Sequence, residues 1–168
     1  MEIQKYPVKY FDFIHASPPC VEYSRAKTTG VRNIDEANKI VLKTLEIINY
    51  FKPKIFVIEN PQSGLLKEQE FMKGLPFFDI DYCKYGFKYR KRTRLWTNLE
   101  GWVPRPLCKK DCGNVVNNRH VETSQRLPSK TKADWGDIPV FHSQTDLYKI
   151  PQLLVEEILN AVNIVCFK

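Results

Sequence analysis

The sequence predicts an α/β domain that begins with a strand, a helix and a second strand. Residues 11–16 largely alternate apolar and polar side chains, which is typical of a β-strand, and a Pro-Pro pair follows. Residues 37–48 repeat apolar side chains at three- and four-residue spacings, which indicates an amphipathic helix. Residues 54–58 form a short apolar run, as expected of a buried strand. These segments predict a right-handed βαβ unit with two parallel strands.

The first strand leads into a stiff loop that carries Cys20. Pro18 and Pro19 have fixed φ angles and cannot continue a sheet ladder, so the chain turns out of the sheet there. A thiol placed directly after them loses little conformational freedom on being positioned, which suits a nucleophile. A buried structural cysteine is the alternative interpretation. Residues 21–32 have no helical or strand period and are expected to form a mobile loop beside the thiol.

The predicted helix has a capping pattern at its start. Asn33 fits the N-cap position, and Glu36 stands three residues later, as in a capping box. The pattern stops at residues 52–53, where a proline follows a lysine. The apolar stripe between these points is most simply explained as core.

The second strand ends at Glu59, which Asn60 and a proline follow. Open α/β sheets bind their ligands beyond the carboxyl ends of parallel strands. Cys20 and Glu59 each stand at such an end. We therefore expect both side chains at one ligand site.

The remaining chain predicts fewer regular elements. Residues 64–74 suit a short helix, residues 77–83 a strand, and residues 94–98 a strand that pairs beside it. Prolines interrupt residues 101–143, which show no periodicity. Residues 151–165 return to helical spacing.

Charge favours a polyanionic partner. The 168 residues carry a formal net charge of +7, which promotes association with nucleic acid. Six of the eleven residues 84–94 are basic, and three aromatic residues lie among them. This mixture is typical of a surface that contacts phosphates and bases together. A solvated basic face is the alternative.

Cysteine usage and hydropathy suggest an intracellular protein. Five unevenly spaced cysteines argue against a secreted disulfide framework and for reduced thiols. No apolar run approaches the roughly 20 residues that span a bilayer, and the first residues lack the pattern of a signal peptide. We expect a cytoplasmic location, or the host cell for a viral protein, and no membrane association.

A possible metal site lies within the irregular segment. Cys108 and Cys112 are separated by three residues, and His120 follows, a spacing compatible with zinc. The sequence offers no obvious fourth ligand, although His142 is a candidate. The favoured interpretation is a basic loop without metal. If this loop is a target-recognition region, the residues that contact DNA would be Lys109, Lys110, Arg119, Arg126, Lys130 and Lys132. A solvated basic loop is the equal alternative.

Three ordered motifs resemble those of the DNA cytosine-5 methyltransferases, most closely the compact phage and viral members. They are Ser17-Pro18-Pro19-Cys20, Glu59-Asn60-Pro61 and Arg92-Thr93-Arg94. The resemblance covers about residues 10–99. It implies the catalytic half of a partial Rossmann-like methyltransferase sheet in residues 1–100. Residues 101–143 would then be a small irregular target-recognition insertion, and residues 144–168 a C-terminal helix that packs on the sheet.

The resemblance also implies roles for individual residues. Cys20 would add as a thiolate to C6 of a flipped cytosine, which makes C5 nucleophilic toward a methyl group. Glu59 would neutralise charge at N3, and Arg92 and Arg94 would hold the flipped nucleotide. The remaining substrate-binding residues would be Ser17, Pro18, Pro19, Asn60, Lys88, Arg90 and Lys91.

The sequence departs from the family in its cofactor motifs. Its seven glycines include no Gly-x-Gly, and only about ten residues precede the nucleophile strand. The S-adenosylmethionine site is therefore expected to be largely absent from this chain. Either a partner chain supplies it, which predicts an exposed apolar surface near residues 11–16, or the chain is a catalytically silent nucleic-acid-binding relative. An RNA cytosine methyltransferase fragment is a further alternative.

Overall fold

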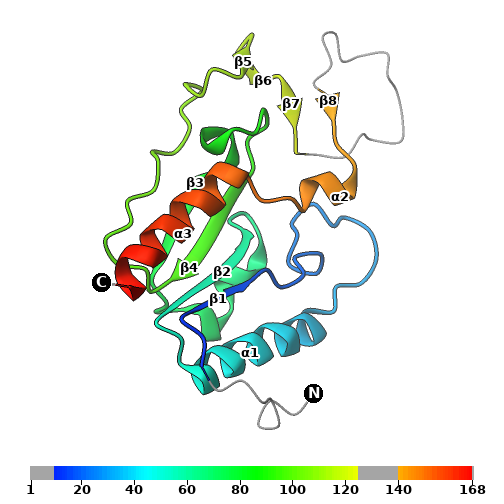
Figure 1. Cartoon of the computed structure of the whole chain (residues 1–168). Coiled ribbons are helices and arrows are strands. Elements are labelled where there is room, and N and C mark those ends of the chain that lie inside the picture. The colour runs from blue at the N-terminus through cyan, green and yellow to red at the C-terminus, as the bar shows by residue number, and fades with distance from the viewer. Residues whose placement is uncertain (1–9, 125–139, 168) are drawn as a thin grey trace.

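A mixed four-stranded sheet forms the centre of the molecule, seen in a computed structural model that describes residues 10–124 and 140–167 (Figure 1). Its strands are β1 (Phe13–Ala16), β2 (Ile55–Pro61), β3 (Phe77–Asp81) and β4 (Arg92–Thr97), in the order β1-β2-β4-β3. β1 and β2 are parallel, as the βαβ prediction requires, whereas β4 is antiparallel to both of its neighbours.

Helix α1 (Ile34–Phe51) covers one face of the sheet. The predicted cap is confirmed, because the Asn33 side chain accepts a hydrogen bond from the Glu36 backbone N–H at 3.1 Å. Lys52 ends the helix in the left-handed conformation, directly before Pro53. Val41 from this helix and Ile58 and Trp96 from the sheet are buried in the core between them.

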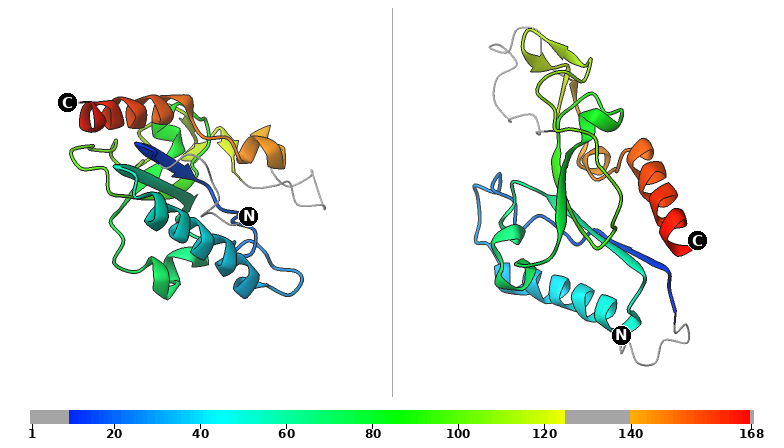
Figure 2. Two further views of the ribbon diagram at one scale, coloured as in Figure 1. Left: turned by 60° about the horizontal axis from the view of Figure 1, so that its bottom comes forward. Right: turned by 90° about the vertical axis from the view of Figure 1, so that its left-hand side faces the viewer.

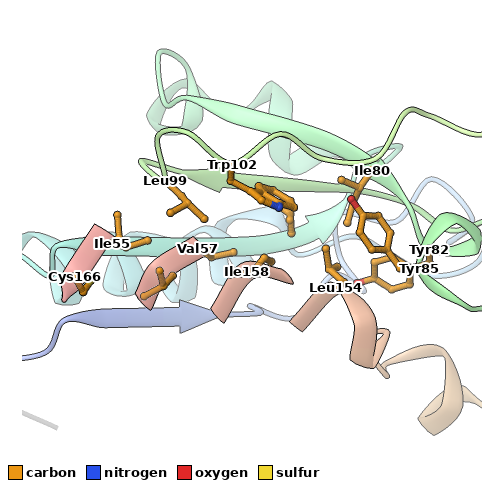
Figure 3. Packing of buried hydrophobic residues seen from close by; sticks show 12 residues of the cluster. Ile55, Val57, Ile80, Tyr82, Tyr85, Leu99, Trp102, Leu154, Ile158 and Cys166 are labelled. Atoms are coloured by element: carbon orange, nitrogen blue, oxygen red, sulfur yellow. The ribbon is translucent and has the colours of Figure 1, made fainter. Parts of the chain in front are cut away.

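Helix α3 (Gln152–Cys166) covers the opposite face, as the two views of Figure 2 show. Its buried stripe is Leu154, Ile158 and Val162, which are the positions that the helical spacing predicts. They pack against Val57 and other apolar side chains of the sheet (Figure 3). The C-terminal helix therefore packs back on the sheet.

The segment between β2 and β4 differs in detail from the prediction. Residues 64–74 form two 3-10 helices, η2 (Leu65–Glu68) and η3 (Glu70–Met72), in place of one α-helix. β3 ends at Asp81 because the chain turns there into the 3-10 helix η4 (Tyr82–Tyr85). Both differences shorten the expected elements without changing their order.

The aromatic residues of the basic segment point inward, contrary to expectation. Tyr85 and Tyr89 are buried, and Phe87 packs against the rings of Tyr82 and Tyr89. In residues 84–94 the aromatic side chains therefore lie on the packed side of the segment, and the basic side chains between them lie on the other side. The aromatic rings are core here and are not available to stack on bases.

The loop that follows Cys20 is anchored, although we expected it to be mobile. Tyr23 is fully buried, and its hydroxyl donates to the Asn38 side chain of α1 at 2.8 Å. Arg32 donates to the backbone carbonyls of Ser24 and Lys27. These contacts join the loop to α1 and to itself.

The segment expected to be irregular contains short strands beyond one end of the main sheet (Figure 1). β5 (Val115–Val116) and β6 (Arg119–His120) form a hairpin, and β7 (Glu122–Thr123) pairs with β8 (Val140–Phe141). The short helix α2 (Gln144–Leu147) precedes α3. Three of the expected DNA-contacting residues, Arg126, Lys130 and Lys132, lie outside the described residues.

Within the described ranges, each helix is too short or too polar to cross a lipid bilayer.

Candidate active site

A pocket of about 310 Å³ lies beyond the carboxyl ends of the parallel strands β1 and β2. The loop after β1 forms one wall, and the end of β2 forms another. The Asn60 side chain joins the two walls, because its Nδ2 donates to the Pro18 carbonyl at 2.9 Å. The lining residues are Ser17, Pro18, Pro19, Cys20, Val21, Glu59, Asn60, Pro61, Lys91 and Tyr148.

Glu59 is held in a buried position at this pocket. Its side chain is on the sheet face that α3 covers, and the residue is 7% exposed. The Tyr82 hydroxyl donates to Glu59 Oε1 at 2.9 Å. Burial, followed by the nearby carboxylate, holds the pKa of Tyr82 well above its usual range. Tyr82 therefore stays protonated and acts as a fixed donor to this carboxyl group.

The environment of Cys20 both raises and lowers the pKa of its thiol. Burial raises its pKa above the ordinary value, and the charge of Glu59 adds to that effect. The Lys91 ammonium lowers the pKa, since a neighbouring positive charge favours the thiolate. The net direction is upward, so the thiol is mainly neutral at neutral pH.

Lys91 is held at the pocket by β4 and by the segment before α3. Its Nζ donates to the Leu147 carbonyl at 2.9 Å and lies 4.9 Å from the centre of the Tyr82 ring. The sequence assigned Lys91 to the nucleotide backbone. Its contacts place it among the groups that surround the thiol and the carboxylate, and its role in binding a nucleotide stays a prediction.

Arg92 and Arg94 do not line this pocket. Asn60 pairs with Arg94 across β2 and β4, so both arginines lie on the sheet face opposite Glu59. Each guanidinium forms a two-pronged ion pair, Arg92 with Asp81 and Arg94 with Asp79. Arg94 also stacks on the Phe77 ring at 3.5 Å from its centre. The structure therefore brings Cys20 and Glu59 together in the pocket. Arg92 and Arg94 form ion pairs with aspartates outside it.

Comparison with known proteins finds a family that the first part of the chain resembles. Residues 1–74 match the family described as C-5 cytosine-specific DNA methylase. That span contains β1, α1 and β2, and with them Cys20 and Glu59. Over these residues the chain is similar to the C-5 cytosine-specific DNA methylases.

A viral relative extends this similarity. The chain is 36% identical over 131 residues to the "Probable DNA (cytosine-5)-methyltransferase" of Frog virus 3 (isolate Goorha). The aligned part covers 66% of this chain and 60% of the relative. The chain thus spans less than two thirds of that protein's length.

Members of the C-5 cytosine-specific DNA methylase family generally use S-adenosylmethionine, and the pocket does not fit that cofactor. Glu59, the carboxylate that lines the pocket, already accepts the Tyr82 hydroxyl. Gly30 has a positive φ near the start of α1, but it lies in the long loop after Cys20 and not in a tight turn directly after a strand. We therefore derive no methyl-transfer step from the residues of this chain.

Several residues of the candidate site were not apparent from the sequence. Tyr148 lines the pocket, and Tyr82 holds Glu59. Asp79 and Asp81 form ion pairs with Arg94 and Arg92. In the sequence, both pairs of residues are two positions apart, so antiparallel pairing of the two strands places each aspartate opposite an arginine. This spacing could have predicted the ion pairs.

Lys88 and Arg90 are exposed and lie outside the pocket lining. Their assignment to a nucleic-acid backbone stays a prediction.

Three cysteines and a histidine gather away from the pocket. The ligand atoms of Cys83, Cys108, Cys112 and His120 all lie within 4.8 Å of one another. The fourth member is Cys83 from η4 and not His142, whose Nε2 lies 2.8 Å from Glu122 Oε2.

Proposed function

We propose that this chain is the catalytic part of a DNA cytosine-5 methyltransferase that binds an extruded cytosine in the pocket between β1 and β2. The observation that supports it best is the meeting of Cys20 and Glu59 in one pocket at the carboxyl ends of two parallel strands. Its volume of about 310 Å³ is at the lower end of small-molecule sites, roughly 300–1,000 Å³, which suits a single base.

In the proposed reaction the Cys20 sulfur forms a bond to C6 of cytosine. The electron pair of the C5–C6 double bond moves toward C5 and into the ring, where charge gathers at N3. Glu59 would share a proton with N3 and neutralise that charge, while Tyr82 holds the carboxyl group in place. Lys91 would support the thiolate before the attack. If C5 then accepts a methyl group, which the cofactor held by the missing half would supply, loss of the C5 proton to a base would restore the C5–C6 double bond. The C6–S bond would break at that step, and its electron pair would return to the Cys20 sulfur.

Arg92 and Arg94 enter this proposal in a different role from the one that the family resemblance implies. Both are paired with aspartates on the far face of the sheet. They would contact the extruded nucleotide only after leaving those partners. In the arrangement described here, they join β4 to β3.

We infer that the cofactor-binding half lies outside the described residues and docks along β1. Among the described residues this strand pairs only with β2, which leaves its other edge open there. Beside it, Phe13 and His15 line a largely apolar hollow of about 280 Å³ together with α3 residues such as Val155 and Leu159, which are 40% and 43% exposed. Further strands, from a preceding segment or from a partner chain, would cover this surface.

Covalent trapping on modified DNA tests the proposal. A duplex with 5-azacytosine is trapped by thiol addition alone, whereas 5-fluorocytosine is trapped only after a methyl group has been transferred. We expect a denaturation-resistant complex with 5-azacytosine. Trapping on 5-fluorocytosine requires S-adenosylmethionine and the missing half.

The matched variants are Cys20→Ser and Cys166→Ser. Cys166 is buried near the C-terminal end of α3, far along the chain from the pocket, so its variant should trap as the natural protein does. Equal trapping by Cys20→Ser would contradict the nucleophile assignment. Binding of the duplex without any trapping would favour the silent DNA-binding alternative, and trapping on RNA alone would favour the RNA alternative.

A further inference from the structure

The cluster of Cys83, Cys108, Cys112 and His120 has the composition of a zinc site. Each residue contributes one ligand atom, and the four atoms lie within 4.8 Å of one another. Thiolate and imidazole groups in a three-to-one ratio are a usual ligand set for structural Zn²⁺. In the described part of the chain the cysteines are all free thiols, so no disulfide accounts for the cluster.

Two sulfur-to-nitrogen distances within the cluster match those around a tetrahedral ion. Zinc binds sulfur at about 2.3 Å and nitrogen at about 2.0 Å, which separates a sulfur and a nitrogen ligand by about 3.5 Å. His120 Nε2 lies 3.6 Å from Cys108 Sγ and 3.4 Å from Cys112 Sγ. The histidine thus presents a ring nitrogen to both sulfurs at the required spacing.

The local backbone shapes the Cys108–Cys112 loop around its sulfurs. The Lys110 N–H donates to Cys108 Sγ at 3.3 Å, a contact that stabilises a thiolate. Lys110 and Gly113 both have positive φ angles, which turn the loop back on itself. Cys83 from η4 and His120 from the β5–β6 hairpin complete the set from outside the loop.

The surrounding segment has polar contacts to the rest of the molecule, such as the Lys84–Asp111 ion pair, but few buried residues of its own. Among residues 103–124, Cys108 is the only buried residue. The hairpin that carries His120 consists of two-residue strands, and short hairpins are marginally stable alone. A segment without a core of its own requires a metal or a disulfide to keep one conformation.

We propose that Cys83, Cys108, Cys112 and His120 bind a structural zinc ion that fastens residues 103–123 to the catalytic sheet. Cys83 belongs to the sheet side, and the other three ligands belong to the fastened segment. The Cys108 N–H also donates to Asp81 Oδ2 at 2.9 Å, and Asp81 holds Arg92. The Asp81 carboxylate therefore accepts hydrogen bonds both from the backbone of the proposed ligand Cys108 and from Arg92. This proposal does not depend on the methyltransferase activity.

Metal content tests the site directly. The chain, purified without chelator and under reducing conditions, should contain one zinc per molecule by elemental mass spectrometry. Replacing zinc with cobalt should give the visible absorption of a tetrahedral thiolate complex. Protein without zinc that also gives no such cobalt spectrum would overturn the proposal. So would a disulfide among the three cysteines in reduced, metal-supplemented protein.

Variants identify the ligands. Cys112→Ser should lose most of its zinc, whereas Cys166→Ser, which changes a buried cysteine outside the cluster, should keep it. His120→Cys supplies a fourth thiolate, so it should retain zinc and shift the cobalt spectrum. If Cys112→Ser does not fold, the His120→Cys variant and the cobalt spectrum of the natural chain still decide the matter. Unchanged zinc in soluble Cys112→Ser, or an unchanged spectrum in His120→Cys, would exclude the proposed ligand set.

Discussion

At Cys20, burial raises the pKa of the thiol and the charge of Lys91 lowers it. The rate of thiol alkylation can measure both effects. Alkylation by iodoacetamide requires the thiolate, so below the thiol pKa its rate should rise about tenfold per pH unit. Lys91→Ala removes the charge that lowers this pKa, whereas Glu59→Gln removes one that raises it. At a fixed pH near 8, we expect the first variant to react about three to ten times more slowly and the second faster.

Mass spectrometry of the Cys20 peptide follows this rate at each pH. Lys88→Ala is the matched control, because Lys88 is exposed and does not line the pocket. A rate in Lys91→Ala equal to that of the control would mean that the lysine does not affect the thiol. A shift of the same sign in both pocket variants would point to altered burial and not to charge.

Tyr82 supports Glu59 through one buried hydrogen bond. Tyr82→Phe leaves the carboxylate oxygen without that donor at a residue only 7% exposed. We expect a loss of about 1–3 kcal/mol in the free energy of unfolding, measured by urea denaturation. Tyr50→Phe changes a residue that is 46% exposed and should have little effect. Equal losses in the two variants would show that the bond to Glu59 is not important for stability.

Residues that end a predicted strand were identifiable from the sequence, and residues that depend on strand pairing were not. Cys20 and Glu59 follow apolar runs, and the βαβ pattern brings both to one edge. The face on which Arg92 and Arg94 lie depends on the register of β4 against β2, which no local pattern reveals. Tyr82 was overlooked because its partner is distant in the sequence.

At the scale of elements, the position of β4 is the main feature that the sequence left open. Residues 94–98 were expected to pair beside the preceding strand, and β4 does pair with β3. It also pairs with β2, so it lies between two strands that precede it in the chain. Consecutive strands are usually neighbours, and an inserted strand departs from that tendency. Helices α1 and α3, by contrast, followed from spacing and capping alone.

Helix α3 should stabilise the sheet mainly through its buried stripe. Leu154 is fully buried, and Leu154→Ala should lower the free energy of unfolding by about 2–5 kcal/mol because it leaves a cavity. Leu159 is on the same helix and is 43% exposed, so Leu159→Ala should cost less than about 1 kcal/mol. Urea denaturation of both variants measures the difference. Similar costs would mean that α3 does not pack as described.

At the scale of the whole molecule, β1 is one of the two edge strands of the main sheet, and the chain carries an excess of positive charge. β1 is an edge strand beside an apolar hollow, which is the surface expected where further strands are missing. The charge of +7 was evident from composition. The sequence did not reveal how much of this charge is free to bind a polyanion. In residues 84–94, three of the basic side chains are paired with aspartates: Lys84, Arg92 and Arg94.

Lys88 and Arg90 are exposed cations of that segment, and we expect them to contact DNA phosphates. Lys88 also forms a long ion pair with Glu122, at 4.0 Å, which a phosphate contact would replace. Each phosphate contact lowers the slope of log K against log salt by about 0.9 for duplex DNA. The double variant Lys88→Ala/Arg90→Ala should therefore flatten the slope by about 1.8, as measured by fluorescence anisotropy across a salt series. Lys39→Ala/Lys43→Ala removes the same charge from α1, where each lysine is paired with a glutamate. If this control flattens the slope equally, net charge alone drives binding, and the basic segment is not a DNA contact.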